Sequence, residues 1–320
     1  MQNATLTVKV KSKKNEAMNI ASFELTSLDG SDLPPFTAGA HIDVHLAPGL
    51  VRQYSLCNSP SERHRYVIGV LRAPNSRGGS EFLHDIIRNG SRLSISMPRN
   101  NFPLAPTAKG SILFAGGIGI TPILCMAEHL SNEGSPFELH YSARTPDRLA
   151  FSADILASPY ADRTIFHFDD AAPEQALNPS EILRMPDAET HIYVCGPSGF
   201  IDHIVHAALT SGWPNDQIHF EHFAARGSHA NATSFTVTLA RSGTIIMVGE
   251  NETVVQALSR NGVEIPVACE QGLCGTCMTG ILGGVPDHRD HLLTATERAS
   301  NACFLPCCSR ALSANLILDL

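Results

Sequence analysis

The sequence predicts a multidomain chain: an antiparallel β-barrel, then a doubly wound α/β domain, then a small domain built around cysteines. Residues 1–104 alternate short apolar segments with turn residues, which is typical of a barrel or sandwich. Residues 105–224 alternate apolar strands with helical segments, which indicates a parallel sheet covered on both faces. After a small, polar linker at 225–232, residues 233–320 carry a distinctive cysteine spacing.

The bulk composition is that of a globular protein. With 320 residues the chain is long enough for two or three domains, and its hydrophobic fraction is 43%. The net charge of −8 and the absence of basic runs argue against a nucleic-acid partner. No stretch approaches the roughly 18 apolar residues that cross a bilayer, and the first residues lack signal-peptide features. Nine cysteines without a disulfide-type pattern fit a reducing compartment, so we expect a cytoplasmic protein without a membrane partner.

The expected elements follow from apolar runs between turn residues. Strands of the barrel are expected at Leu6–Val10, Ile20–Leu25, His41–Leu46, Arg52–Leu56, Tyr66–Val70 and Arg92–Ser96, with a helix near Ser80–Arg88. Strands of the α/β domain are expected at Ser111–Ala115, Phe137–Ser142, Thr164–Phe168, His191–Cys195 and Gln217–Glu221. The first of these five strands precedes a helix that reaches Leu130, and the fourth precedes one that reaches Ser211.

The last domain has fewer clear elements. A hairpin is expected from Ser234–Ala240 and Thr244–Val248, followed by a helix at Thr253–Asn261. A final strand is expected at Asn315–Asp319. The cysteine segment lies between the helix and this last strand.

Four cysteines follow the spacing C-x4-C-x2-C-x29-C. They are Cys269, Cys274, Cys277 and Cys307. This is the spacing of a plant-type [2Fe–2S] loop. Structural zinc sites usually show two close pairs of ligands instead, so the pattern favours iron and sulfide. Gly272 and Gly275 are expected to adopt positive φ, so that the backbone can turn tightly around the cluster.

The fourth ligand has two neighbouring cysteines as alternatives. Cys303 comes a strand's length early, and Cys308 would point to the opposite face from Cys307 in an extended segment. The x29 spacing favours Cys307.

Two motifs in the barrel can hold a flat, anionic cofactor. One strand carries Arg52, Tyr54, Ser55 and Leu56. An arginine can pair with phosphate, and a tyrosine ring can stack against a flat ring. The second motif, Arg77-Gly78-Gly79-Ser80, opens a helix, where backbone N–H groups and a hydroxyl can bind an anion. Alone, the first motif is typical of an exposed strand and the second of an ordinary capped helix. Their joint occurrence before a dinucleotide-type domain favours a binding site.

Two glycine turns follow strands of the α/β domain. The segment Gly116–Pro122 reads G-G-x-G-x-x-P rather than G-x-G-x-x-G, yet it stands between a buried strand and a helix, as a pyrophosphate-binding turn does. The segment Cys195-Gly196-Pro197 ends a later strand, where ligands bind in open α/β sheets. A glycine there lets a nicotinamide ring approach, and a small thiol can lie beside its reactive carbon.

These motifs, in this order, resemble the ferredoxin reductase superfamily with a fused plant-type ferredoxin. R-x-Y-S-L, R-G-G-S, G-G-I-G-I-T-P, C-G-P and the cysteine pattern are similar to those of the phthalate dioxygenase reductase and vanillate O-demethylase reductase family, over essentially the whole chain. The resemblance implies an FMN-binding antiparallel β-barrel at 1–104, a doubly wound NAD-binding α/β domain at 105–224, and a β-grasp [2Fe–2S] ferredoxin domain at 233–320.

The resemblance also implies roles for individual residues. Arg52, Tyr54, Ser55 and Leu56 would contact FMN, Gly69, Val70 and Leu71 would run beneath its ring, and Gly78, Gly79 and Ser80 would bind its phosphate. Gly117, Gly119, Thr121, Cys195, Gly196 and Pro197 would line the nicotinamide site, and Phe223 would lie against the flavin. The resemblance implies FMN rather than FAD for this domain order, and no segment of the chain is dedicated to an adenylate, so FMN is favoured. NADH is favoured over NADPH by the family alone, because Ser142 and Arg144 leave the choice open.

The implied function is that of a reductase for a Rieske-type oxygenase, which is its protein partner. Electrons from NADH would pass by way of FMN and a [2Fe–2S] cluster, and the protein would position and tune these groups rather than supply a catalytic acid or base. Exposed residues near the cluster, namely Glu270, Gln271, Met278 and the segment Asp287–Asp290, are docking candidates. Two other classes compete: a redox sensor, which would not need flavin and nicotinamide sites, and a stand-alone flavin or quinone reductase, which would not need the cluster.

Overall fold

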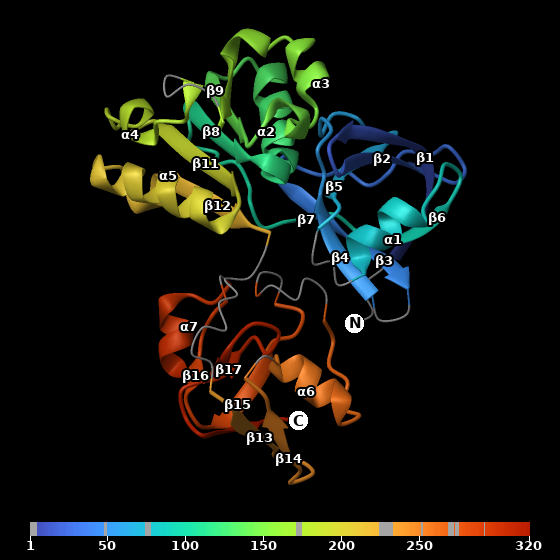
Figure 1. Ribbon diagram of the computed structural model, residues 1–320, viewed down its shortest axis with the longest axis vertical. Coiled ribbons are helices and arrows are strands. Elements are labelled where there is room, and N and C mark those ends of the chain that lie inside the picture. Colours follow the sequence, from blue (N-terminus) through green and yellow to red (C-terminus); the bar gives the residue numbers. More distant parts are fainter. Residues whose placement is uncertain are drawn as a thin grey trace. The chain divides into compact units, whose positions relative to one another are not determined.

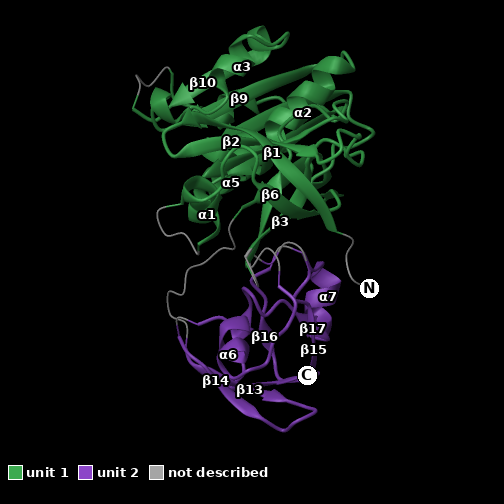
Figure 2. Cartoon of the chain, turned by 90° about the vertical axis from the view of Figure 1, so that its right-hand side faces the viewer, with its two compact units in different colours: residues 1–223 green, residues 224–320 purple. Residues whose placement is uncertain are grey.

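The computed structural model describes residues 5–47, 50–73, 78–170, 175–223, 233–250, 252–267, 272, 275–290 and 292–320. The chain divides into two compact units, Met1–Phe223 and Ala224–Leu320 (Figure 2). None of the described helices is long and apolar enough to cross a membrane; the longest, α2 and α5, have 13 residues each.

The first unit begins with the predicted antiparallel barrel (Figure 1). Its elements are β1 (Thr5–Ala17), β2 (Ile20–Ser27), β3 (Ala40–Ala47), β4 (Leu50–Ser55), β5 (Tyr66–Leu71), α1 (Gly79–Asp85), β6 (Arg92–Ser96) and β7 (Arg99–Asn100). The strand order is β4-β3-β6-β1-β2-β5, and β7 pairs with β3. An antiparallel bridge between Leu56 and Ile68 joins the two edges of this sheet, and the backbone N–H of Cys57 donates to the carbonyl of Val67 at 2.9 Å. This contact closes the barrel.

The second half of the first unit is the predicted parallel sheet. Its elements are β8 (Gly110–Gly116), α2 (Ile120–Asn132), β9 (Phe137–Ala143), α3 (Ser152–Leu156), β10 (Thr164–Phe168), α4 (Pro179–Ile182), β11 (Thr190–Gly196), α5 (Ser198–Thr210) and β12 (Ile218–His222), with short 3-10 turns at Gly117–Gly119, Pro146–Arg148, Ala161–Arg163 and Asn215–Gln217. The order is β10-β9-β8-β11-β12, and all pairs are parallel. The strand order switches sides between β8 and β11: β9 and β10 lie on one side of β8, and β11 and β12 lie on the other. Open α/β sheets bind ligands at such a switch point.

Side chains that alternate along β8 show that the sheet is covered on both faces. Leu113 and Ala115 are buried in one apolar core with residues of α2, while Phe114 is buried in a separate core with residues of α5. Because successive residues of a strand point to opposite faces, α2 and α5 lie on opposite sides of the sheet. The core on the α2 side is continuous with the barrel core, so barrel and sheet fold as one unit.

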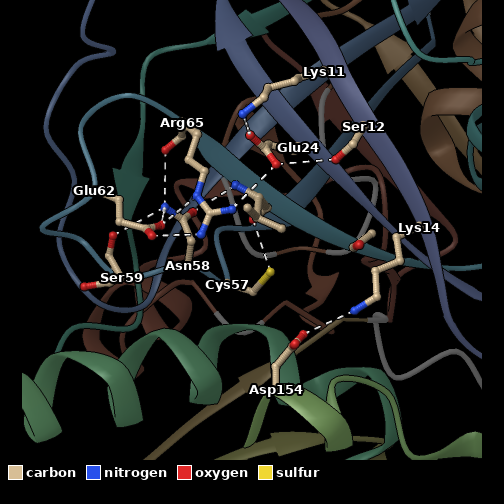
Figure 3. Close-up of polar contacts among 12 residues, drawn as sticks. Lys11, Ser12, Lys14, Glu24, Cys57, Asn58, Ser59, Glu62, Arg65 and Asp154 are labelled. Carbon is tan, nitrogen blue, oxygen red and sulfur yellow. Dashed lines mark hydrogen bonds and ion pairs between the residues drawn. The ribbon is translucent and has the colours of Figure 1, made fainter. Parts of the chain in front are cut away.

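Polar contacts also join the barrel to the α/β half (Figure 3). The Lys14 ammonium on β1 lies 3.4 Å from the Asp154 carboxylate on α3. Asn132, at the end of α2, donates to the Ser59 hydroxyl at 3.1 Å. The loop that carries Ser59 is itself ordered by Arg65, whose guanidinium donates two hydrogen bonds, of 2.8 and 3.0 Å, to the Glu62 carboxylate.

The second unit is the predicted β-grasp fold. Its elements are β13 (Phe235–Leu239), β14 (Ile245–Val248), α6 (Val254–Arg260), β15 (Thr279–Gly283), β16 (Pro286–Asp287), α7 (Ala295–Ser300), β17 (Cys303–Phe304), β18 (Arg310–Ala311) and β19 (Asn315–Leu318). The main sheet has the order β14-β13-β19-β15-β17, with a central parallel pair of β13 and β19, and β16 pairs with β18. Apolar residues of α6 share the core with this sheet.

The expected strands and helices are confirmed, and the strands Arg92–Ser96 and Thr164–Phe168 match their expected bounds. Strand β1 is longer than expected because polar residues beyond Val10 continue to pair with β2, with Lys11 forming a 2.7 Å ion pair to Glu24. Elements α3, α4, α7, β7 and β15–β18 were not predicted from the sequence. The predicted linker, 225–232, lies outside the described residues.

Candidate functional site

The two predicted glycine turns pack directly against each other at the ends of β8 and β11. A Cβ atom built on Gly119 would lie 2.2 Å from the backbone oxygen of Cys195, and one built on Gly196 would lie 3.1 Å from Cα of Gly116. Gly117 has φ +54°, in the left-handed region that favours glycine. Only glycines allow this approach, and Pro197 then starts α5 from an extended conformation. The turns therefore present bare backbone at the edge where nucleotides bind.

The start of α2 lies against strand β5 of the barrel. Thr121 is buried, and its hydroxyl donates to the Ile118 carbonyl at 3.1 Å. A Cβ on Gly69 would lie 2.7 Å from Cγ2 of Thr121, so the barrel backbone touches the α/β half at this point. The next residue, Val70, is buried, and Leu71 is half-buried.

The two barrel motifs also meet each other. The Arg52 side chain on β4 lies against Gly79: a Cβ atom built on Gly79 would be 2.6 Å from Cγ of Arg52. Gly78 has φ +85°, and the Ser80 hydroxyl accepts a 3.2 Å hydrogen bond from the N–H of Ala73. A guanidinium beside a tight glycine turn fits a phosphate group. Arg77, the first residue of this motif, lies outside the described residues.

The remaining barrel residues of the site lie at the end of β4. Tyr54 is half-buried, and burial raises the pKa of its phenol. Ser55 and Leu56 are both buried. Phe223, which follows β12, is half-buried and packs against the core shared by barrel and sheet.

Glu221 is a site residue that the sequence did not single out. It stands on β12 directly opposite Cys195 of β11. The residue is partly exposed, but its Oε2 atom is buried and has no hydrogen-bond partner among the described residues. Burial raises the pKa of Glu221 to about 8, and a hydrogen bond from the Ser55 side chain opposes that rise. Three polar side chains therefore converge from β4, β11 and β12.

The Cys195 thiol lies in a strongly desolvating environment. It is fully buried, and burial together with the nearby Glu221 raises its pKa well above the ordinary value. The thiol is therefore protonated at neutral pH. This protonation state does not suit a nucleophile.

The end of β9 carries the residues expected to choose between NADH and NADPH. Ser142 is buried and Arg144 is exposed. The Asp147 carboxylate accepts a hydrogen bond from the Thr145 hydroxyl, and the Asp147 carbonyl accepts one from the Met18 N–H at 2.8 Å. The β1–β2 turn thus holds this segment against the barrel.

In the second unit, two of the four predicted ligands lie in one buried cluster. Cys277 and Cys307 are 3% and 5% exposed and share an apolar core with Leu293 and Leu305. Cys303 and Cys308 are only partly buried at the margin of this core. Cys269 and Cys274 lie outside the described residues, and within the described part of the chain no three metal-ligating side chains come together.

The local backbone fits a loop wrapped around a cluster. Gly272 and Gly275 both have φ +73°, which confirms the conformation expected for these glycines. Thiols from residues 30 positions apart in the chain are brought together as the C-x4-C-x2-C-x29-C spacing requires.

The expected docking residues differ in exposure. Met278 is 46% exposed, as expected. The expectation of exposure is wrong for Asp290, which is 3% exposed, because it forms polar contacts with Leu293 and Arg298 inside the unit. Glu270 and Gln271 lie outside the described residues.

A barrel packed on a nucleotide-type sheet, with a separate β-grasp unit that buries cysteines, defines a flavin and iron–sulfur oxidoreductase. The comparisons with known proteins agree. A family model for a 2Fe-2S iron-sulfur cluster binding domain matches residues 237–312, and a model for an oxidoreductase NAD-binding domain matches residues 113–206.

Similar proteins cover nearly the whole chain. Vanillate O-demethylase oxidoreductase of Pseudomonas putida is 52% identical over 97% of this chain and 98% of the relative. Tetrachlorobenzoquinone reductase of Sphingobium chlorophenolicum is 43% identical over 95% of this chain and 94% of the relative. The solved structure of phthalate dioxygenase reductase, described as modular and as transferring electrons from pyridine nucleotides to [2Fe–2S], matches with TM-score 0.80 at 40% identity over 99% of this chain and 98% of that one.

The chain belongs to the reductase family that includes vanillate O-demethylase oxidoreductase and phthalate dioxygenase reductase.

Proposed function

We propose that this chain is the reductase component of a two-component, Rieske-type aromatic oxygenase or O-demethylase. It takes electrons from NADH and delivers them through FMN and a [2Fe–2S] cluster to the oxygenase. One observation carries this proposal: the chain joins a paired glycine-turn site for a nicotinamide to a separate β-grasp unit that gathers cysteine thiols. The family relationship supports the same reading.

The residues that would hold each group fit that group. Arg52 and the turn Gly78–Ser80 would hold the FMN phosphate, and Tyr54, Ser55, Leu56, Gly69–Leu71 and Phe223 would surround its ring. Gly117, Gly119, Thr121 and Cys195–Pro197 would hold the nicotinamide. Cys269, Cys274, Cys277 and Cys307 would ligate the cluster. When bound, FMN accepts a hydride and returns single electrons, which is the form that a [2Fe–2S] cluster carries.

At the nicotinamide site, residues of this chain would fix the position of the ligand and hold a proton on a nearby carboxyl group. Packed glycines bring backbone close to the ligand without side-chain obstruction, which fixes the geometry of the reacting atoms. Glu221 holds a proton at its carboxyl group through neutral pH, because its pKa is about 8. With the Ser55 hydroxyl bonded to it, this carboxyl places a neutral rather than a charged group beside Cys195.

The proposed division is an FMN domain at 1–104, an NAD domain at 105–224 and a ferredoxin domain at 233–320. The strand boundaries support it, since the barrel ends at Asn100, the parallel sheet spans Gly110–His222, and β13 begins at Phe235. We also propose a cytoplasmic location, supported by buried cysteines such as Cys57 and Cys125 that form no disulfide.

The test is a Cys277→Ser variant, with Cys303→Ser as a matched control in the same unit. We expect NADH to reduce the flavin of the Cys277→Ser chain at the wild-type rate, while electron delivery to a Rieske-type oxygenase stops. The control should support oxygenase turnover. Oxygenase turnover that survives in Cys277→Ser would contradict the proposal.

A second candidate function is direct reduction of a quinone, favoured by the similarity to tetrachlorobenzoquinone reductase. A quinone can take two electrons from a flavin without an iron–sulfur cluster. If this is the main activity, NADH-dependent quinone reduction should be unchanged in Cys277→Ser.

A further inference from the structure

Asp290 is a buried carboxylate in the β-grasp unit with an unusual set of contacts. Its side chain is 0% exposed. Oδ2 accepts a 2.8 Å hydrogen bond from the Leu293 N–H and lies 3.6 Å from the Arg298 guanidinium, which also donates to the Asp290 carbonyl at 2.6 Å. Oδ1 has no hydrogen-bond partner among the described residues, and Nδ1 of His288 is 3.6 Å away. A buried charge of this kind is costly, so its position calls for an explanation.

Asp290 lies against Gly272. A Cβ built on Gly272 would lie 2.9 Å from Cα of Asp290 and 2.5 Å from the Cys308 sulfur. Gly272 stands between the first two predicted ligands, Cys269 and Cys274. The backbone at Gly272 therefore lies close against Asp290 and Cys308, with no room for a side chain at this position.

Asp290 also reaches the thiol core through its hydrogen bond. Leu293, whose N–H it accepts, packs with Cys277 and Cys307 in the buried cluster. The neighbouring Arg289 N–H donates to the Ser309 hydroxyl at 3.1 Å, which ties the same segment to the chain just after Cys307. The segment around Asp290 thus touches the ligand loop on one side and the fourth ligand's segment on the other.

Capping of helix α7 does not account for this carboxylate. The N-terminus of α7 already has a complete capping box, in which Thr294 and Glu297 satisfy each other's backbone N–H groups. Asp290 is four residues before that cap. Its contacts are with the loop, with Leu293 and with Arg298.

We propose that Asp290, with Arg298 as its counter-ion, is a positioning residue for the iron–sulfur loop. Its backbone supports Gly272, and its carboxylate holds Leu293 against the ligand thiols. This rests on the proposed function, because it presumes that the four cysteines hold a cluster. It also assigns a role to Cys308, whose sulfur backs the loop at Gly272 rather than ligating iron.

The test compares Asp290→Ala and Asp290→Asn with Asp287→Asn as the matched control. Asp287 belongs to the same segment, but its carboxylate is 28% exposed and is paired with Arg289. Each full-length chain is reconstituted with iron and sulfide without oxygen. Cluster content, the rate of cluster loss to a chelator, the EPR spectrum of the reduced cluster and the midpoint potential are then measured. The unfolding temperature of the cluster-free chain is measured in parallel.

We expect Asp290→Ala to lose its cluster at least severalfold faster than wild type, with an altered EPR spectrum. Asp290→Asn can still accept from Leu293, so it should retain the cluster better than Asp290→Ala. Its midpoint potential should move upward, because a buried negative charge has been removed. The control should match wild type in all four measurements.

Two results would overturn the proposal. One is an Asp290→Ala chain that keeps its cluster as long as wild type does, with the same EPR spectrum. The other is faster loss that only follows a proportionate fall in the unfolding temperature of the cluster-free chain, because that would show a general structural role. If Asp290→Ala does not fold, the midpoint potential of Asp290→Asn decides, and a potential equal to that of the wild type overturns the proposal. A wild-type chain that binds no [2Fe–2S] cluster would instead contradict the proposed function.

Discussion

Replacing Glu221 with glutamine should change how the stability of the first unit depends on pH. The folded chain holds a proton on Glu221 up to a pKa of about 8, whereas an ordinary glutamate releases it near 4.5. Between these values the folded state binds more protons than the unfolded state, so the stability of the wild type must fall as pH rises. Glutamine has the same shape and no titration, so Glu221→Gln lacks this loss.

The size of the effect follows from the shift. Each pKa unit corresponds to about 1.4 kcal/mol, so the shift of Glu221 from 4.5 to about 8 should cost the wild type up to about 5 kcal/mol relative to Glu221→Gln, most of it between roughly pH 5 and pH 8. The loss should be nearly complete above the folded-state pKa. Below about pH 4.5 the carboxyl is protonated in both folded and unfolded states, and the two proteins should be equally sensitive to pH.

The chain contains a convenient reporter for this measurement. Its single tryptophan, Trp213, is buried in the α/β half of the first unit. Urea unfolding followed by Trp213 fluorescence therefore reports on the unit that contains Glu221. Glu133→Gln, which removes an exposed carboxylate from the same unit, is the control and should behave like the wild type. Parallel pH profiles for wild type and Glu221→Gln would refute the reasoning.

Three further variants test other parts of the first unit. Gly119→Ala places a Cβ against the Cys195 carbonyl of the second glycine turn, so it should destabilise the unit by roughly 1–3 kcal/mol and abolish NADH binding. Gly199→Ala, with open space around the added Cβ, should leave thermal melts and nucleotide titrations unchanged. Lys13→Met removes an ammonium that donates to three carbonyls at the end of α1, at 2.5, 3.2 and 3.3 Å. The free energy of unfolding in urea should fall by about 1–3 kcal/mol, and an unchanged midpoint and slope of the urea transition would contradict this expectation. Arg52→Gln should weaken FMN binding roughly tenfold or more in fluorescence titrations, while the exposed Arg92→Gln should not; equal affinities would remove Arg52 from the phosphate site.

Apolar patterning predicted most of the fold because the buried strands are the strongest signal in the chain. Thr164–Phe168 and Arg92–Ser96 were expected with their observed bounds. The signal is missing in α7, where no residue is buried. There only the Thr294 and Glu297 capping pair marks the helix in the sequence.

The site was predictable where a motif carries its own geometry. The glycine turns at Gly116–Gly119 and Cys195–Pro197 were expected to bring their backbone close to a ligand. In the structure the two turns pack directly against each other, as glycines allow. Glu221 was missed because its neighbours come from other strands: Ser55 reaches it only when the barrel closes on the sheet. An acidic residue beside Phe220 near the end of a predicted strand, two positions before Phe223, is the signal that could have drawn attention to it.

For Asp290 the sequence predicted exposure, whereas the side chain is buried. Acidic and basic residues in the segment Asp287–Asp290 suggest a solvated loop, and charge alone places them on the surface. Burial of Asp290 depends on Arg298, eight positions later, and on the Leu293 N–H, and no local periodicity encodes that arrangement. Burial of a charged residue through contacts with residues distant in the sequence could therefore not be predicted from local sequence patterns.

The most direct test of the central proposal is an anaerobic titration of the FMN- and cluster-loaded chain with NADH, followed by visible absorption and EPR. The proposed relay predicts that the chain accepts one electron beyond what its flavin alone accepts, that this electron gives the EPR signal of a reduced [2Fe–2S] cluster, and that Cys277→Ser lacks both. A chain whose flavin is fully reduced by NADH while no reduced-cluster signal develops would contradict the proposal.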